Sequence, residues 1–234
     1  QLLPPRTYTM GGGPSHMIIP PVPYDPCSLK DAQLPHNCDE ILKHADSPVD
    51  RSSTTKLYEQ LYAGVYLNKN KKKYWVDKET KSNCFTLFAR DLAITWGEDT
   101  RYWRWLPLKE SSDESFEIAE LLNVCWLEIH GRLEMASLSP GTTYEVIFVV
   151  KLNGSANGWE VPVNVKLTLP DGTTQEHKEN LATKPKDQWF EIRAGSFKAS
   201  AKGGEMVVSI YEFEGGKWKK GLIIKGVNIK PKAA

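Results

Sequence analysis

An aromatic and charged segment between residues 90 and 105 carries the residue types best suited to bind a ligand. Three tryptophans, a tyrosine and two arginines fall within the ten positions 96–105, beside Gly97 and two acids. A buried strand rarely carries so many ring N–H groups and charges, because each needs a polar partner inside the core. An indole on a loop offers a flat apolar face together with a polar N–H. The segment therefore predicts recognition of something flat or ring-shaped: a sugar, a nucleic-acid base or an aromatic side chain of a peptide.

The overall composition narrows the class of protein. The chain has 234 residues, with Lys+Arg 30 against Asp+Glu 29. This balance argues against a protein whose main task is to coat nucleic acid, while a local basic patch stays open. The strongest apolar run, Val146 to Val150, is too short to span a bilayer and lies between Glu145 and Lys151. The start of the sequence lacks an apolar region of the secretory type, so we expect no classical secretion.

The cysteines indicate neither a disulfide scaffold nor a metal site. Cys27, Cys38, Cys84 and Cys125 are too few and too scattered for a disulfide framework. Cys27 and Cys38 are grouped with His36, but no second Cys/His pair sits at the spacing of a zinc finger. We therefore predict free thiols in a reducing compartment, no metal ion and no cofactor.

Two segments have the composition of connecting chain. Residues 1–35 are rich in proline and contain the run Gly11–Gly13, so we expect an extended or disordered leader without a core. Residues 69–73, with the sequence KNKKK, form a basic connector. A solvated linker is one interpretation of this connector, and a nuclear-import or RNA-contacting patch is the other.

Residues 36–68 are expected to form an amphipathic helical extension. The segment 39–45 is typical of a short helix. A second helix is predicted from residue 54 to about residue 67, with apolar side chains at helical spacing: Leu57, Leu61 and Val65. We expect these helices to dock on a neighbouring surface.

From residue 74 to residue 234 the pattern changes to short β-strands. In the segment 125–130, Cys125, Leu127 and Ile129 alternate with more polar positions, and 161–169 alternates cleanly before a Pro-Asp-Gly turn. Further strands are indicated at 144–152, 205–213 and 221–229. Short strands with turn residues between them predict a mainly β fold, an antiparallel, jelly-roll-like β-sandwich.

Four motifs follow one another along this β region: WGEDTRYWRW at 96–105, VCWLEIHG at 124–131, LSPGTTY at 138–144 and WKKGLIIKGV at 218–227. In this order they resemble the phloem protein 2 family of plant lectins, whose domain is shared with the tobacco jasmonate-inducible lectin. The resemblance covers about residues 74–232. It continues upstream, where the segments 45–53 and 56–66 are similar to the region that precedes the lectin domain in cucurbit phloem lectins.

The resemblance implies a lectin that binds β-1,4-linked N-acetylglucosamine oligomers, the core of N-glycans and the glycoproteins that carry them, without catalysis. It also implies a homodimer in the sieve-element and companion-cell sap, in cytoplasm and nucleus, with RNA and a phloem filament protein as further partners. Two alternatives stay open. One is an RNA-binding phloem transport protein, and the other is a structural component of sieve-tube filaments that couples to partners through Cys27 or Cys38.

An enzyme is the least supported class. A glycosidase needs two carboxyl groups that flank the scissile bond, one of them with a raised pKa. Acidic pairs such as Glu98 and Asp99 show no pattern that separates an acid from a nucleophile. The sequence contains neither a nucleophile elbow nor a phosphate-binding glycine loop.

Tryptophans are the first candidates for direct contact with a sugar. Trp96 and Trp103 match the family positions where ring stacking is expected, and a Gly-Glu-Asp turn between them would place both rings on one rim. Trp105 is a weaker candidate. Three further tryptophans are expected to be core residues: Trp126, Trp159 and Trp189.

A sugar site also needs carboxylates that accept hydrogen bonds from the hydroxyl groups of the sugar. Glu205 and Glu212 resemble family positions at the two ends of one strand. Their odd spacing places them on opposite faces, so they cannot both line one site without a bulge. Glu212 is the better candidate, because it precedes a loop whose side chains would close the site: Lys217, Trp218 and Lys219. Arg101 and Tyr102 are further donors to hydroxyl or acetyl groups.

Overall fold

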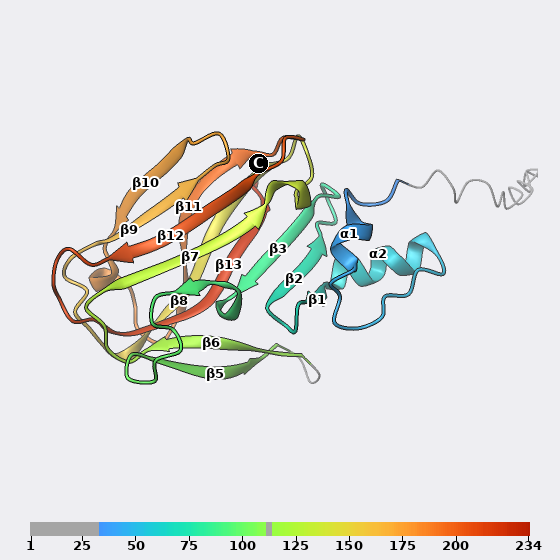
Figure 1. Cartoon of the computed structure of the whole chain (residues 1–234). Coiled ribbons are helices and arrows are strands. Elements are labelled where there is room, and N and C mark those ends of the chain that lie inside the picture. Colours follow the sequence, from blue (N-terminus) through green and yellow to red (C-terminus); the bar gives the residue numbers. More distant parts are fainter. Residues whose placement is uncertain (1–32, 111–113) are drawn as a thin grey trace, which may run out of the picture. The chain divides into compact units, whose positions relative to one another are not determined.

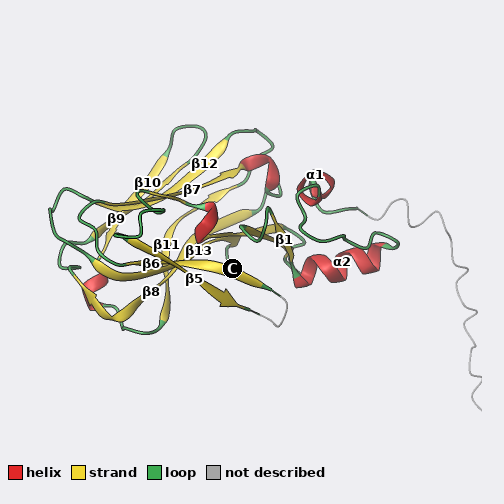
Figure 2. Cartoon of the chain, turned by 60° about the horizontal axis from the view of Figure 1, so that its bottom comes forward, coloured by secondary structure: helices red, strands yellow, loops and turns green. Residues whose placement is uncertain are grey.

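The computed structural model describes residues 33–110 and 114–234, and most of this chain is antiparallel β-structure. Figure 1 and Figure 2 show two β-sheets packed on each other, with two short helices beside one edge of the first sheet. The predicted mainly β sandwich is confirmed.

The first sheet has eight strands and is organised around β13. Neighbours follow in the order β1–β2–β3–β13–β6–β5, and β8 pairs with both β13 and β11. Its strands are β1 (Val65–Leu67), β2 (Lys72–Val76), β3 (Asn83–Phe88), β5 (Trp103–Lys109), β6 (Ser115–Leu121), β8 (Thr143–Asn157), β11 (Trp189–Lys198) and β13 (Lys220–Pro231). Because β13 pairs with three other strands, it joins the N-terminal hairpin to the rest of the sandwich.

The second sheet has five strands in the order β10–β9–β12–β7–β4. They are β4 (Ala93–Ile94), β7 (Leu127–Glu134), β9 (Val163–Thr168), β10 (Thr174–Glu179) and β12 (Glu205–Glu212). Short 3-10 turns lie between strands at Ala89–Asp91, Met135–Ser137 and Leu181–Thr183. Burial alternates along β7 and β9, as expected of strands with one face on the core and the other toward solvent.

The core lies between the two sheets and is filled by the inward set of each strand. Val163, Val165 and Val208 of the second sheet are fully buried against residues of the first sheet such as Val146 and Phe148. Each buried side chain of this size contributes about 1.5–3 kcal/mol relative to exposure to water. The sheets are therefore held together by ordinary hydrophobic packing.

The helices α1 (Cys38–Leu42) and α2 (Thr54–Ala63) close one edge of the core. Ser53 caps α2 by accepting a hydrogen bond from the amide of Lys56 at 3.1 Å. The helix ends at Gly64, whose φ of 103° breaks the helical path, whereas the sequence predicted a helix to about residue 67. The following residues form β1, so the end of the extension pairs with β2 in the first sheet.

The basic segment 69–73 is a hairpin turn and the start of β2. Asn68, Lys69 and Asn70 have left-handed backbone conformations with φ of 56°, 61° and 58°. The carboxylate of Asp46 accepts the amides of Lys69 and Asn70 at 2.6 and 2.8 Å and thereby stabilises the turn. This arrangement differs from the expected linker, because β1 and β2 pair directly across the turn. The predicted leader 1–35 lies almost wholly outside the described residues.

No helix of the segments 33–110 and 114–234 has the length and apolar character that crossing a bilayer would require.

Candidate functional site

Three loop segments, 95–102, 122–126 and 213–219, meet at one end of the sandwich (Figure 1). The first two are joined at Tyr102, whose carbonyl accepts the amide of Leu122 at 2.8 Å. Segments far apart in the sequence therefore form one continuous surface, and the strand pairing fixes their relative positions.

Lys219 fastens the third segment to the second. Its backbone exchanges two hydrogen bonds with Val124, at 2.8 and 2.9 Å. Its side chain is fully buried, where the ammonium donates to the carbonyl of Cys125 at 2.8 Å and lies 3.2 Å from Oε1 of Glu212. A buried ammonium requires such compensation, because its unpaired charge would cost several kcal/mol. Lys219 and Glu212 thus hold the loops from below, and neither faces solvent as the predicted binding role requires.

Each of the three segments presents an exposed tryptophan. Trp96, Trp126 and Trp218 expose 50%, 41% and 57% of their surface, which makes them the most exposed tryptophans among the described residues. We call these three side chains, together with Tyr102 and Phe213 beside them, the tryptophan surface. Trp96 also has a left-handed backbone with φ of 59°, which costs a bulky residue on the order of 1 kcal/mol.

Ring stacking fixes the orientation of two parts of this surface. Trp126 lies flat on Phe213, with ring centroids 4.0 Å apart and planes 9° from parallel. Phe213 in turn stacks on Tyr211 at 5.6 Å. On the other side, Trp96 packs on Tyr102 at 5.5 Å. One face of Trp126 is therefore covered by a neighbouring ring, and Trp96 is held at 38° to the ring of Tyr102, so both tryptophans are pre-oriented.

A chain of polar side chains on the outer face of β7 and β12 holds Trp126 in place. The indole N–H of Trp126 donates to Oε2 of Glu128 at 2.8 Å, and the other carboxylate oxygen lies 2.9 Å from Nε2 of His130. Nδ1 of His130 lies 2.6 Å from the hydroxyl of Ser209. The hydrogen bond from Trp126, followed by that from His130, holds the pKa of Glu128 below its ordinary value.

Ser209, the last member of the Glu128–His130–Ser209 chain, is surrounded by backbone amides that belong to the sheet. Ser209 lies in the middle of β12 and is 6% exposed. Because β12 pairs with β7 on one side and β9 on the other, the amides around Ser209 are committed to the sheet. The chain of hydrogen bonds is suited to orient a ring rather than to activate a nucleophile.

Trp103 does not reach the tryptophan surface. It is 2% exposed, opens β5 opposite Leu121, and points into the core. Its indole N–H has no hydrogen-bond partner among the residues that the structure describes. An indole enclosed in this way cannot stack on a ligand, so the turn after Trp96 does not place both rings on one rim.

Trp105 supports the surface from the side. Its indole N–H donates to the carbonyl of Gly97 at 2.8 Å. The guanidinium of Arg90 lies over the ring, with Cζ 3.6 Å from the ring centroid. A hollow of about 320 Å³ lies beside Trp105 and Trp96, and Leu92 also lines it. Trp105 therefore borders a small depression beside an exposed ring without presenting a free face of its own.

The other predicted polar residues fall into two groups. Arg101 is exposed at the tryptophan surface. Its guanidinium forms a bidentate ion pair with the carboxylate of Asp99, with a shortest N–O distance of 2.7 Å, and lies over the ring of Tyr102. Lys217 is exposed next to Trp218. Glu205 is at the opposite end of β12, roughly 24 Å from Glu212 along the strand, and pairs with Arg132 at 3.0 Å. The structure does not bring Glu205 to this surface.

Sequence reasoning missed Trp126 and its partners Glu128 and Phe213. Trp126 was expected in the core, and its 41% exposure shows that this expectation was wrong. The signal was present in the alternation of the segment 125–130, whose inward set leaves position 126 on the outer face. Trp159, in contrast, is buried as predicted and donates to the carbonyl of Lys220 at 3.0 Å, and Trp189 is half-buried.

The described cysteines are enclosed or half-buried. Cys38 is 2% exposed, and burial raises the pKa of the Cys84 thiol to about 12, so both thiols are poorly reactive. Cys27, the third member of the group with His36, lies outside the described residues. Within 33–110 and 114–234, no three or more His, Cys, Asp or Glu side chains gather in a way that could hold a metal ion.

Comparison with known proteins gives a consistent assignment. The model of the family described as Phloem protein 2 matches residues 82–231. Protein PHLOEM PROTEIN 2-LIKE A1 of Arabidopsis thaliana is 48% identical over 223 residues, 94% of this chain and 90% of its own length. A protein named lectin from Luffa acutangula is 48% identical over 205 residues, 86% of this chain and 97% of its own. Among solved structures, a xylan-binding domain from Paenibacillus barcinonensis matches at 15% identity and a TM-score of 0.34, covering 63% of this chain and 90% of its own. With the family model and both close relatives in agreement, the chain belongs to the phloem protein 2 family.

Proposed function

We propose that this chain is a non-catalytic lectin that binds N-acetylglucosamine oligomers at the tryptophan surface. The proposal rests on the exposure of Trp96, Trp126 and Trp218 on three loop segments that are hydrogen-bonded to one another. Such a group of exposed rings marks an interaction site on a soluble protein surface. The Luffa acutangula relative, which is named a lectin, supports a carbohydrate ligand.

The chemistry of the surface suits a pyranose. The apolar C–H face of a sugar ring stacks on an indole, while its hydroxyl groups need donors and acceptors placed around the ring. Trp126 would supply the central platform, with the Glu128 carboxylate beside it as an acceptor. Arg101 and Lys217 would donate from the two flanking loops. The hollow of about 320 Å³ beside Trp96 and Trp105 would take an N-acetyl group.

The proposal changes the roles of several predicted residues. Trp96 and Trp218 stay candidate contacts, and Trp126 joins them. Trp103 becomes a core residue, while Glu212 and Lys219 become the buried pair that positions the third loop.

A series of alanine variants tests this assignment. Calorimetric titration with N,N′,N″-triacetylchitotriose should show that Trp126→Ala and Trp218→Ala each weaken binding about tenfold or more, as expected when about 1.4 kcal/mol of ring stacking is lost. Leu34→Ala is the matched control, because Leu34 is also an exposed apolar residue, 45% exposed, but lies near the opposite end of β7. Equal affinities in all three variants would contradict the proposed site.

RNA binding receives weaker support from the basic hairpin. Lys72 lies 3.6 Å from a carboxylate oxygen of Asp91, and Lys73 lies 3.4 Å from Glu110, so two of the four lysines are already paired. Lys69 and Lys71 stay exposed. A filament role through a disulfide at Cys38 is likewise weakened by the burial of its thiol.

A further inference from the structure

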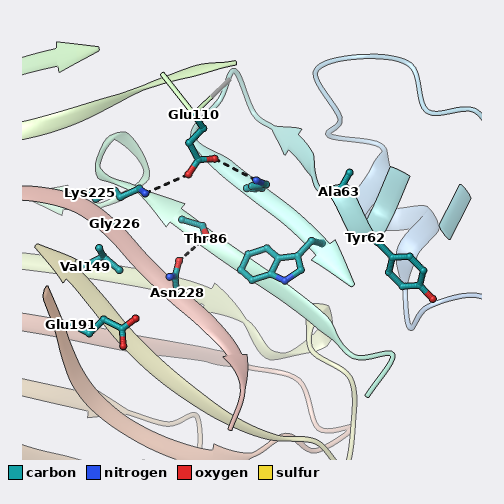
Figure 3. Close-up of a pocket in the computed structure, with 11 residues that line it drawn as sticks. Tyr62, Ala63, Thr86, Glu110, Val149, Glu191, Lys225, Gly226 and Asn228 are labelled. Carbon is teal, nitrogen blue, oxygen red and sulfur yellow. Dashed lines mark hydrogen bonds and ion pairs between the residues drawn. The ribbon is translucent and has the colours of Figure 1, made fainter. Parts of the chain in front are cut away.

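A groove separate from the tryptophan surface lies on the outer face of the first sheet, which faces away from the core (Figure 3). It has a volume of about 470 Å³. Side chains of β2, β3, β13, β8 and β11 line it, and the last turn of α2 forms one rim with Tyr62 and Ala63. With neighbouring strands about 4.8 Å apart, the groove crosses four strand gaps and extends over roughly 19 Å.

One end of the groove is a closed charge network. The carboxylate of Glu110 lies 3.4 Å from the ammonium groups of both Lys73 and Lys225 and accepts the hydroxyl of Tyr66 at 2.9 Å. Burial opposes ionisation of Glu110, but the Tyr66 hydrogen bond and the two ammonium charges together hold its pKa below the ordinary value. The positive charge at this end is thus partly neutralised.

The middle of the groove presents polar groups that the described part of the chain leaves unused. Oδ1 of Asn228 accepts the hydroxyl of Thr86 at 2.7 Å, which turns the amide N–H groups of Asn228 away from that bond. Within residues 33–110 and 114–234, these N–H groups, the indole N–H of Trp75 and the carboxylate of Glu191 make no hydrogen bond or ion pair. Figure 3 shows Asn228 beside Thr86, with Glu191 farther toward the lower left.

These groups select the chemistry of a ligand. Two lysines and two glutamates line the groove, so its formal charge sums to zero, and a polyanion would meet both carboxylates. An apolar ligand would leave the Asn228 amide and the Glu191 carboxylate unsatisfied. A neutral polyhydroxyl chain can donate to Glu191, accept from Asn228 and Lys225, and place a ring face near Trp75.

We propose that this groove is a second saccharide site, which takes a neutral oligosaccharide laid across the strands from Trp75 to Glu191. The choice of ligand class rests on the proposed lectin function, while the site is separate from the tryptophan surface. The groove lies on the outer face of the first sheet, whereas Glu128, the partner of Trp126, lies on the outer face of the second sheet. One chain with two saccharide sites can bridge two glycans without forming a dimer.

Nuclear magnetic resonance of the indole N–H groups tests the second site in the intact chain. The Trp75 signal is assigned by its loss in Trp75→Phe and followed during titration with triacetylchitotriose and, separately, cellotetraose. It should shift in the wild-type chain and equally in a Trp96→Ala/Trp126→Ala double variant. The shift should be lost in Glu191→Ala/Asn228→Ala, which removes both unused polar groups from the groove.

The number of saccharides bound per chain is a second measurement, and it does not require that the Trp75→Phe variant folds. We expect about two saccharides for each wild-type chain and about one for each double variant. Binding only at the tryptophan surface, with no Trp75 shift for either sugar, would overturn the second site and leave the lectin proposal intact. A Trp75 shift without any effect of Trp96→Ala/Trp126→Ala on stoichiometry would instead overturn the first site. No binding of either sugar would overturn both.

Discussion

At the scale of single residues, the side of the strand on which a tryptophan falls decides its role. Trp126 is 41% exposed, whereas Trp103 is 2% exposed. The alternation of segment 125–130 contains enough information to place Trp126 outward. The segment 96–105 does not contain enough information to place Trp103, because the turn before Trp103 leaves the first residue of β5 undetermined from sequence. The amide of Trp103 bonds to the carbonyl of Asp99 at 3.0 Å and sets that start.

Burial of Trp103 predicts a stability effect rather than a binding effect. Trp103→Ala should lower the free energy of unfolding by about 3–5 kcal/mol, because it opens a cavity in the core. Urea denaturation measures this loss. Trp218→Ala is the matched control and should stay within about 0.5 kcal/mol of wild type. A stable Trp103→Ala protein that has lost only sugar affinity would show that Trp103 contacts the ligand after all.

The buried pair of Lys219 and Glu212 predicts strong coupling between the two residues. Lys219→Met leaves the Glu212 carboxylate buried without its cation and should cost about 3–5 kcal/mol of unfolding free energy. The double variant Lys219→Met/Glu212→Gln should cost less than the sum of the two single changes. Additive losses in denaturant titrations would mean that the two side chains act independently.

Glu128 predicts a dependence of stability on pH. The pKa of Glu128 is lower in the folded chain than its ordinary value, so its contribution is present above the ordinary pKa and is lost as the pH falls through the lower folded value. Glu128→Gln removes this titrating group. Between about pH 6 and about pH 3, the variant should lose less stability than wild type in thermal unfolding. Parallel losses would assign the acid sensitivity to other carboxylates.

At the scale of elements, the strands were predictable and their connections were not. Segments that alternate between apolar and polar residues, such as 161–169, can be predicted as strands from sequence, because one face of each strand is buried. The end of α2 and the hairpin after β1 depend on a three-residue strand that exists only through pairing with β2. The lysine-rich segment 69–73 contains no local pattern that predicts the pairing of β1 with β2.

Gly64 marks the point where helix changes to strand. It combines φ of 103° with a site where an added Cβ would lie 2.3 Å from Cε of Lys73. Gly64→Ala should therefore lower stability by about 1–3 kcal/mol. Gly141→Ala is the matched control, with φ of 85° and no atom within 4 Å of its added Cβ, so it reports the backbone cost alone. If both variants lose the same stability, the contact with Lys73 plays no part.

At the scale of the whole molecule, the binding surface arises from long-range pairing. The loops that carry Trp96, Trp126 and Trp218 are brought together by β7, β12 and β13, and their meeting cannot be read from any one segment. The sequence singled out Trp96 and Trp218 by residue type and by family resemblance. It could not separate exposed rings from Trp103, or free lysines from the buried Lys219. The burial of Trp103 depends on the pairing of β5 with β6, and the burial of Lys219 depends on its contacts with the 122–126 loop.

Calorimetric titration of the wild-type chain with N,N′,N″-triacetylchitotriose, at low and at high salt, tests the central claim most directly. Stacking and neutral hydrogen bonds respond little to ionic strength, whereas binding through phosphate contacts weakens steeply. The lectin proposal predicts heat of binding with nearly the same affinity at both salt concentrations. No heat with the trisaccharide, together with salt-sensitive binding of single-stranded RNA, would contradict it.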